Sequence, residues 1–223
     1  MESKYRKRRI ILPIIGLILM VIITFLFVKQ QRYLKAERES TYQLTEDETQ
    51  LLQEGDIIFR HGYGIISDAI VKYAKENYPI SHCGIVVLDS LGELAVIHTV
   101  SNTLANIDGM QLDKLDKFIR ESQVNSVIVS RYHSLDSTLS TRIAEHAKYY
   151  LSRQIPFDNN FDCEDSTKFF CTEFVWRVFN EVAEVDLYKL LSSQRVDCMN
   201  FAAFLHPARF SILINHCESQ PIE

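Results

Sequence analysis

The chain opens with a long uncharged stretch that separates a basic N-terminus from the rest of the sequence. Residues 10–28 form a run of 19 positions without a charged side chain, and residues 1–9 before it carry five basic groups. A helix of this length spans roughly 28 Å, close to the ~30 Å hydrocarbon core of a bilayer. The pattern therefore predicts a basic N-terminal tail over residues 1–9 and a transmembrane anchor over residues 10–28.

Two other interpretations of this stretch are weaker. A cleavable signal peptide has a shorter apolar run and a cleavage site of small residues, whereas this run ends in Phe-Leu-Phe-Val before Lys29. A buried core helix is disfavoured because no face of the segment is polar. Basic residues lie on both sides of the run, but those at the start of the chain favour a cytoplasmic N-terminus. We expect a single-pass protein of the cell membrane with its body on the extracytoplasmic side.

The pattern after the anchor alternates between helical and strand periodicity. Residues 29–44 are polar and charged and are expected to form a juxtamembrane stalk, and Thr45 with Glu48 matches a capping box that opens a short helix. Apolar residues at helical spacing predict further helices, and runs rich in β-branched residues predict strands. The helical stripes lie within 65–74, 139–151 and 170–182, and the strands are expected at 56–59, 83–88, 94–100 and 126–129.

These elements predict one domain over residues 45–214, followed by a C-terminal tail over 215–223. Strands come mostly in the middle with helices around them, so the expected fold class is α+β, an antiparallel sheet packed against helices and preceded by one transmembrane helix. The 223-residue chain has an ordinary globular composition and a net charge of −5, but the part after residue 28 carries −9. A body this acidic is not expected to bind nucleic acid.

Two histidines fall on the predicted hairpin in the middle of the chain. A three-residue loop over 90–92 ends in glycine, as such loops prefer, and pairs Asp89 with Glu93. In that register His98 faces Gly84, which places His82 and His98 on one face as diagonal neighbours. The alternative is that each imidazole is simply satisfied by a backbone partner.

Cys171 lies where the last predicted helix begins. Unpaired N–H groups and the helix dipole favour an anion there, so the thiol pKa falls and the sulfur becomes nucleophilic. The alternative is a buried, inert cysteine, since cysteine is among the most buried residue types. We assign no catalytic role to the other four cysteines, which allow three disulfide pairings if the body is exported: Cys83, Cys163, Cys198 and Cys217.

Three short motifs, in this order, resemble those of the permuted papain-like amidases of the YaeF/YiiX type, within the NlpC/P60 superfamily. They are Gly-Asp-Ile-Ile-Phe-Arg at 55–60, Ser-His-Cys-Gly-Ile-Val at 81–86 and Phe-Cys-Thr-Glu-Phe-Val-Trp at 170–176. The histidine comes first and the cysteine 89 positions later, whereas unpermuted papain-like enzymes carry the cysteine first. The resemblance implies a permuted papain-like fold over most of the body.

By position, the resemblance implies that Cys171 is the nucleophile and His82 its general base. His98 occupies the position where many permuted relatives carry a glutamate. With a histidine there, the chain looks more like the lecithin–retinol acyltransferase branch. The implied activity is a membrane-anchored cysteine amidase or peptidase that works through a thioester without cofactor or metal. Its substrate is a peptide or acyl amide, with cell-wall peptide suggested by analogy. Candidates for substrate binding are Arg60, Tyr63 and Arg131.

Other functions remain open at this point. The same Cys-His pair suits an acyltransferase, a thioesterase or a lipid hydrolase, and the fold also suits a catalytically silent, membrane-tethered binding domain. Zinc binding by His82, His98 and Cys171 has the right ligand types, but no C-x-x-C or H-x-x-x-H spacing supports it. The sequence does not indicate an oligomeric state.

Overall fold

The chain begins with one very long helix. The computed structural model describes residues 2–101, 107–190 and 198–217, and α1 (Glu2–Glu39) runs through the first 38 of them. The stalk expected from residue 29 therefore starts as helix, because residues 29–39 are mostly good helix formers. Within the described residues, α1 is long and apolar enough over Ile14–Glu39 to cross a membrane, and its apolar window is not buried by the body.

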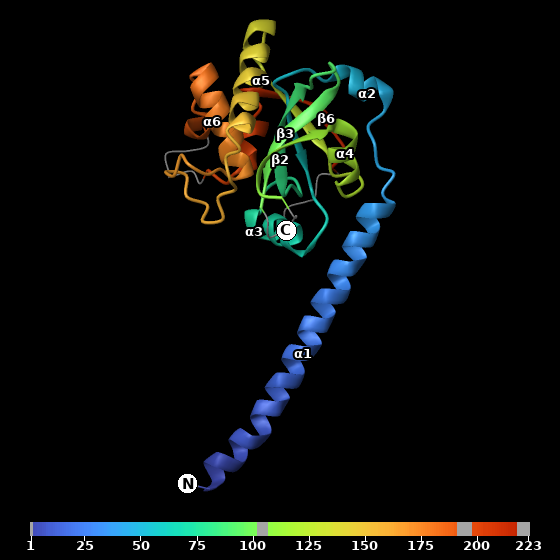
Figure 1. Cartoon of the computed structure of the whole chain (residues 1–223), viewed down its shortest axis with the longest axis vertical. Helices are drawn as coiled ribbons and strands as arrows, with labels where there is room; N and C mark the ends of the chain where they lie inside the picture. The colour runs from blue at the N-terminus through green and yellow to red at the C-terminus, as the bar shows by residue number, and fades with distance from the viewer. Residues whose placement is uncertain (1, 102–106, 191–197, 218–223) are drawn as a thin grey trace.

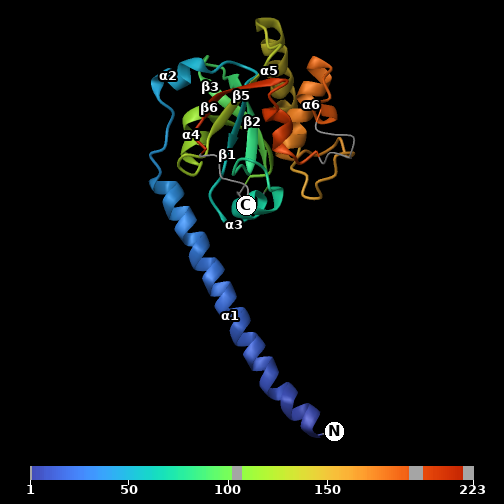
Figure 2. The same cartoon turned by 180° about the vertical axis from the view of Figure 1, so that it is seen from behind.

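The body is built on a six-stranded antiparallel sheet with the order β4-β3-β2-β1-β5-β6. Helices α5 and α6 cover one face, and α4 lies against the other (Figure 1 and, from behind, Figure 2). The α+β prediction is confirmed. The strands are β1 (Ile57–Arg60), β2 (His82–Leu88), β3 (Leu94–Val100), β4 (Gly109–Lys114), β5 (Ile128–Tyr132) and β6 (Phe210–Asn215).

The helices follow the predicted stripes with one addition. Thr45 and Glu48 form the expected capping box, and Asp136 caps α5 by accepting a hydrogen bond from the backbone N–H of Leu139 at 2.7 Å. The sequence pattern did not predict β4, α4 or β6, and the strand that it predicted at 126–129 starts two residues before β5. The helices are α2 (Glu46–Leu51), α3 (Ile65–Ala74), α4 (Leu115–Arg120), α5 (Ser137–Ser152), α6 (Cys171–Ala183) and two 3₁₀ turns, η1 (Leu187–Leu190) and η2 (Phe201–Leu205).

The β2–β3 hairpin has the predicted register. Ile85 pairs with Ile97 and Leu88 with Leu94, and Gly92 takes the left-handed conformation at φ 78° that closes the loop. Gly84 has no room for a side chain, because a Cβ there would lie 2.6 Å from Val96 and 2.7 Å from the carbonyl of Ile97. The backbone of β2 therefore approaches β3 closely beside His98.

Alternation along β2 divides the core into two layers. Cys83, Ile85 and Val87 belong to the larger cluster under α5 and α6, whereas Val86 belongs to the smaller cluster under α4. The chain after β6 continues this packing, because Cys217 is buried in the larger cluster. The C-terminal tail expected from residue 215 therefore begins later, and residues 218–223 lie outside the described part.

Candidate active site

Cys171 is the first residue of helix α6, and the residues around it determine the environment of its thiol. Phe170 is the N-cap without a side-chain cap bond in the described structure, and Glu173 in the first turn has one buried carboxylate oxygen without a hydrogen-bond partner. Glu173 is buried and pairs with Arg177 at 2.7 Å, and burial raises its pKa to about 7 despite that ion pair. Cys171 itself is half-buried. Its first-turn N–H groups have no intrahelical acceptor, so they are suited to an anion.

His82 and His98 form a direct hydrogen bond. His82 Nε2 lies 2.8 Å from His98 Nδ1, and His98 Nε2 lies 3.1 Å from a carboxylate oxygen of Asp113 on β4. Both rings pack against Phe118 of α4, with centroids 5.9 Å and 5.3 Å away. The predicted placement of the two histidines on one face of the hairpin is therefore what the structure shows. Asp113, which the sequence analysis did not single out, continues the chain of contacts.

The hydrogen bonds fix which nitrogen of each ring carries the proton. Burial acts to raise the pKa of Asp113, but hydrogen bonds from His98 and Lys117 outweigh it and hold that pKa below its usual range. The ionised carboxylate accepts, so His98 Nε2 donates; burial lowers the pKa of His98, and the neutral ring then accepts at Nδ1. His82 Nε2 must donate to it, which leaves a lone pair on His82 Nδ1.

Cys171 meets His82 where β2 begins. His82 is the first residue of β2 and packs against Phe118 of α4, whereas Cys171 is the first residue of α6. Burial lowers the pKa of His82 to about 4, opposed by a hydrogen bond to Cys171. A neutral His82 next to a thiol is able to take its proton.

Cys83 is a neighbour of Cys171 that the sequence analysis set aside. Its side chain points away from His82, because successive residues of a strand face opposite sides, and this direction carries it towards α6. The pKa of Cys171 is lowered most by a hydrogen bond from the Cys83 thiol and next by the contact with His82. Together these two contacts outweigh burial, which acts to raise that pKa. Burial and the Cys171 contact raise the pKa of Cys83, so it stays a thiol and donates.

We expect Cys83→Ala to raise the pKa of Cys171, because the substitution removes a hydrogen-bond donor to the thiolate. The measurement is the rate of alkylation by iodoacetamide as a function of pH. The wild-type midpoint should lie well below the ordinary value of 9.0, and the variant's midpoint should be higher. Cys83→Ser keeps a donor and is the matched control. An unchanged midpoint in Cys83→Ala would show that this contact does not tune the nucleophile.

The three candidates for substrate binding occupy different places. Arg60 faces His82 across the β1–β2 ladder but is 8% exposed, with its guanidinium 4.2 Å above the Phe118 ring and bonded to the Phe118 carbonyl at 2.9 Å. Burial is the main cause of the lowered pKa of His82 and of His98, and the positive charge of Arg60 lowers both pKa values further. The structure does not support a substrate-lining role for Arg60.

Arg131 lies at the other end of the strands. Its guanidinium forms two 2.7 Å hydrogen bonds with the fully buried Asp56, which precedes β1, and a further bond with the carbonyl of Leu51. The buried Asp56 carboxylate is neutralised by the partly exposed Arg131, and this pair lies at the end of β1 opposite the Arg60–His82 pair, so Arg131 is not part of the site around His82. Tyr63 is half-buried in the bend between β1 and α3, on the His82 side, and its contact with substrate stays a prediction.

One disulfide connects the segments that flank α6. Cys163 precedes the helix and Cys198 follows it, and the structure pairs them over a Cα–Cα distance of 6.3 Å. The Cys198 carbonyl accepts hydrogen bonds from Thr172, next to the candidate nucleophile, at 2.8 Å and from Tyr188 at 2.6 Å. Of the other cysteines in the described residues, Cys83 and Cys217 are free and buried.

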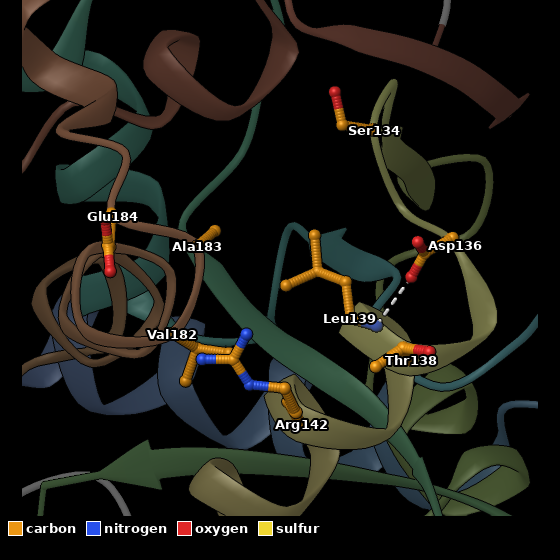
Figure 3. A pocket seen from close by; sticks show the side chains of 8 residues that line it. All are labelled: Ser134, Asp136, Thr138, Leu139, Arg142, Val182, Ala183 and Glu184. Carbon is orange, nitrogen blue, oxygen red and sulfur yellow. Dashed lines mark hydrogen bonds between the residues drawn. The ribbon is translucent and has the colours of Figure 1, made fainter.

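A separate depression lies on the outside of the body between α5 and α6 (Figure 3). It has a volume of about 310 Å³, and Leu139, Val182 and Ala183 face it together with Asp136, Arg142 and Glu184. Its lining, all within the described residues, includes neither Cys171 nor His82. We therefore do not connect it with the candidate chemistry.

A histidine-bearing strand that precedes a cysteine-bearing helix, on an antiparallel sheet, defines a permuted papain-like protein. The chain belongs to the family of permuted papain-like amidases of the YaeF/YiiX type, the C92 family, whose model matches residues 51–203. Its kind of function is accordingly that of a cysteine hydrolase or amidase. No curated protein matches the chain.

The fold also matches a solved structure. The crystal structure of the metalloprotein YiiX from Escherichia coli O157:H7 superposes with a TM-score of 0.57 at 18% identity, covering 73% of this chain and 97% of that one. At this identity the likeness concerns the fold alone.

A metal ion does not fit the candidate residues. Both nitrogens of His98 and Nε2 of His82 are already taken by hydrogen bonds within the chain. The described residues contain no group of three or more histidine, cysteine or acidic side chains placed to hold an ion. The zinc interpretation of His82, His98 and Cys171 is therefore not supported by the donors present.

Proposed function

We propose that the protein is a membrane-anchored cysteine amidase or peptidase that works through a thioester. Cys171 is the nucleophile, His82 the base, and His98 with Asp113 holds His82 in the required tautomer. The observation that carries the proposal is the directed series of hydrogen bonds from Asp113 to His82, which leaves the lone pair on His82 Nδ1 for the thiol. The body lies on the extracytoplasmic side of the cell membrane, and α1 anchors it.

The reaction has two halves. The Cys171 sulfur attacks the substrate carbonyl carbon while its proton passes to His82 Nδ1, and the carbonyl oxygen becomes an oxyanion that the Cys171 N–H stabilises. The C–N bond breaks, the departing amine takes the proton from His82, and a thioester remains. Water then attacks the thioester with His82 as base, releasing the acid and restoring the thiol.

The proposal is tested by labelling the protein with an acyl electrophile and mapping the modified residue. We expect the label on Cys171, because Cys83 and Cys217 are buried and burial raises the pKa of both thiols. The control is the same reaction after denaturation, in which all three free cysteines should react alike. A folded protein whose Cys171 reacts no faster than a free thiol would favour the silent binding domain instead.

A second candidate is acyl transfer or thioester and lipid hydrolysis by the same pair. It is favoured by His98 as the residue behind His82, which resembles the lecithin–retinol acyltransferase branch, and by the apolar α1. Substrate profiling separates the two candidates, because an amidase releases amino groups from peptides whereas an acyltransferase moves acyl chains between acceptors.

A further inference from the structure

Helix α3 presents apolar side chains that the body leaves uncovered. All ten of its residues are described, and none is buried; Ile66 is 44% exposed and Tyr73 80%. These two side chains are seven positions apart, so they share one stripe of the helix. Ile70 projects at the flank of this stripe, roughly 40–60° around the helix from the other two, and packs against the larger core cluster, which fixes the helix to the body.

The juxtamembrane part of α1 is bonded to this helix. Lys29, the first residue after the apolar run, forms a 2.8 Å ion pair with Asp68 of α3, and the Tyr33 hydroxyl donates to the same carboxylate. Gln30 accepts a hydrogen bond of 3.3 Å from the N–H of Ile65. Both views show α3 at the end of the body from which α1 runs away (Figures 1 and 2). Consequently α3 lies within about one helical turn of the end of the apolar run.

The contact is suited to persist at neutral pH. Burial acts to raise the pKa of Asp68, but hydrogen bonds from Lys29 and Tyr33 outweigh it and lower that pKa. His61, which follows β1, adds a third contact to the other carboxylate oxygen at 3.2 Å. An ionised Asp68 therefore ties α1 and the β1–α3 connection together.

We propose that α3 lies in the interface of the bilayer that α1 spans, with Ile66 and Tyr73 in contact with lipid. This inference rests on the proposed membrane anchor. A short apolar helix with an aromatic side chain and lysines at its edge is typical of interfacial helices, and the exposed Lys72 and Lys75 are placed to meet lipid phosphates. Because the end of the apolar run fixes the height of α3, the surface fits a bilayer better than a soluble partner.

The same placement puts the candidate catalytic centre on the side of the body that faces the membrane. β1 ends at Arg60 just before α3, and β2 begins at His82 just after it, whereas the hairpin loop at 90–92 lies at the opposite end of β2. His82 is therefore on the membrane side of the sheet. The substrate class that follows is an amide or ester carried by a lipid and presented at the bilayer surface.

The depth of α3 is measured with tryptophan variants of the full chain in vesicles of phosphatidylcholine and phosphatidylglycerol. Tyr73→Trp is compared with Leu91→Trp, a matched control because Leu91 is 78% exposed but lies in the hairpin loop. Emission of the native Trp176 in the wild type is subtracted. Lipids brominated in their acyl chains should quench the Tyr73→Trp signal roughly twofold and leave the Leu91→Trp signal unchanged.

Equal quenching of the two variants in protein that floats with the vesicles would overturn the inference while leaving the anchor intact. Protein that does not float would overturn both. For the substrate class, Ile66→Ser with Tyr73→Ser should lower turnover of a bilayer-held acyl amide about tenfold and leave a water-soluble thioester unaffected. Equal loss on both substrates would overturn the substrate class. Wild-type protein inactive on both would contradict the proposed function without touching the quenching result.

Discussion

Cys171→Ala is expected to lower turnover at least about a thousandfold while the thermal midpoint stays nearly unchanged. The sulfur forms the covalent bond of the proposed reaction, and no other side chain at the start of α6 replaces it. The structural cost is small because Cys171 is half-buried and alanine is a good helix former. Turnover of an amide substrate and thermal unfolding by circular dichroism, measured on the same preparation, test both halves of the expectation.

Cys217→Ala is the matched control for this substitution. Cys217 is also a free cysteine, but burial raises its pKa to about 11, and it lies just after β6, outside the candidate site. We expect this variant to keep its turnover. Activity of Cys171→Ala within about tenfold of the wild type would end the assignment of the nucleophile.

The hairpin is the part of the site that the sequence predicted best. Strand periodicity has a period of two, so one correctly placed turn decides the face of every residue on both strands. Gly92 supplied that turn, and the Asp89 N–H donates to the Glu93 carbonyl at 2.8 Å as the three-residue loop requires. The contact between His82 and His98 follows from this local geometry.

The parts that the sequence did not predict depend on contacts between distant segments. β4 reads Gly-Met-Gln-Leu-Asp-Lys, has no β-branched residue and forms an edge of the sheet, so its strand signal is weak. Asp113 could be placed beside His98 only once β4 was known to pair with β3. Cys83 points away from His82, and only the position of α6 shows that this direction leads to Cys171.

The arginines show why charge near a strand is an unsafe guide to a substrate site. The partner of Arg131 is Asp56, 75 positions earlier, and the pair is invisible in the local pattern. Arg60 pairs with His82 across the sheet, but its guanidinium stacks on the ring of Phe118, which lies on the unpredicted helix α4. Arg131 is held by Asp56 at the end of β1 away from His82, and Arg60 is buried against the Phe118 ring with its Nε atom unpartnered within the described residues.

Replacing His82 by alanine should cost more turnover than replacing His98. His82→Ala removes the group that holds the transferred proton, with an expected loss of about 10²–10⁴-fold. His98→Ala leaves that group in place and removes only the acceptor that fixes its tautomer, so part of the His82 population still presents a lone pair to the thiol. The measurement is kcat and KM for both variants on one amide substrate, with the loss expected in kcat. The reverse ranking would mean that the two roles are exchanged.

Asp113 provides the sharper test of the same geometry, because it acts only through His98. Asp113→Asn has nearly the same shape but no negative charge, so His98 is free to turn its donor towards His82 and kcat should fall. Asp113→Glu keeps the carboxylate and should recover part of the loss. The wild-type profile of kcat/KM should drop as the pH falls through about 4, where His82 becomes protonated and no longer accepts. If Asp113→Asn lowered thermal stability but left kcat and this profile unchanged, Asp113 would support only the fold.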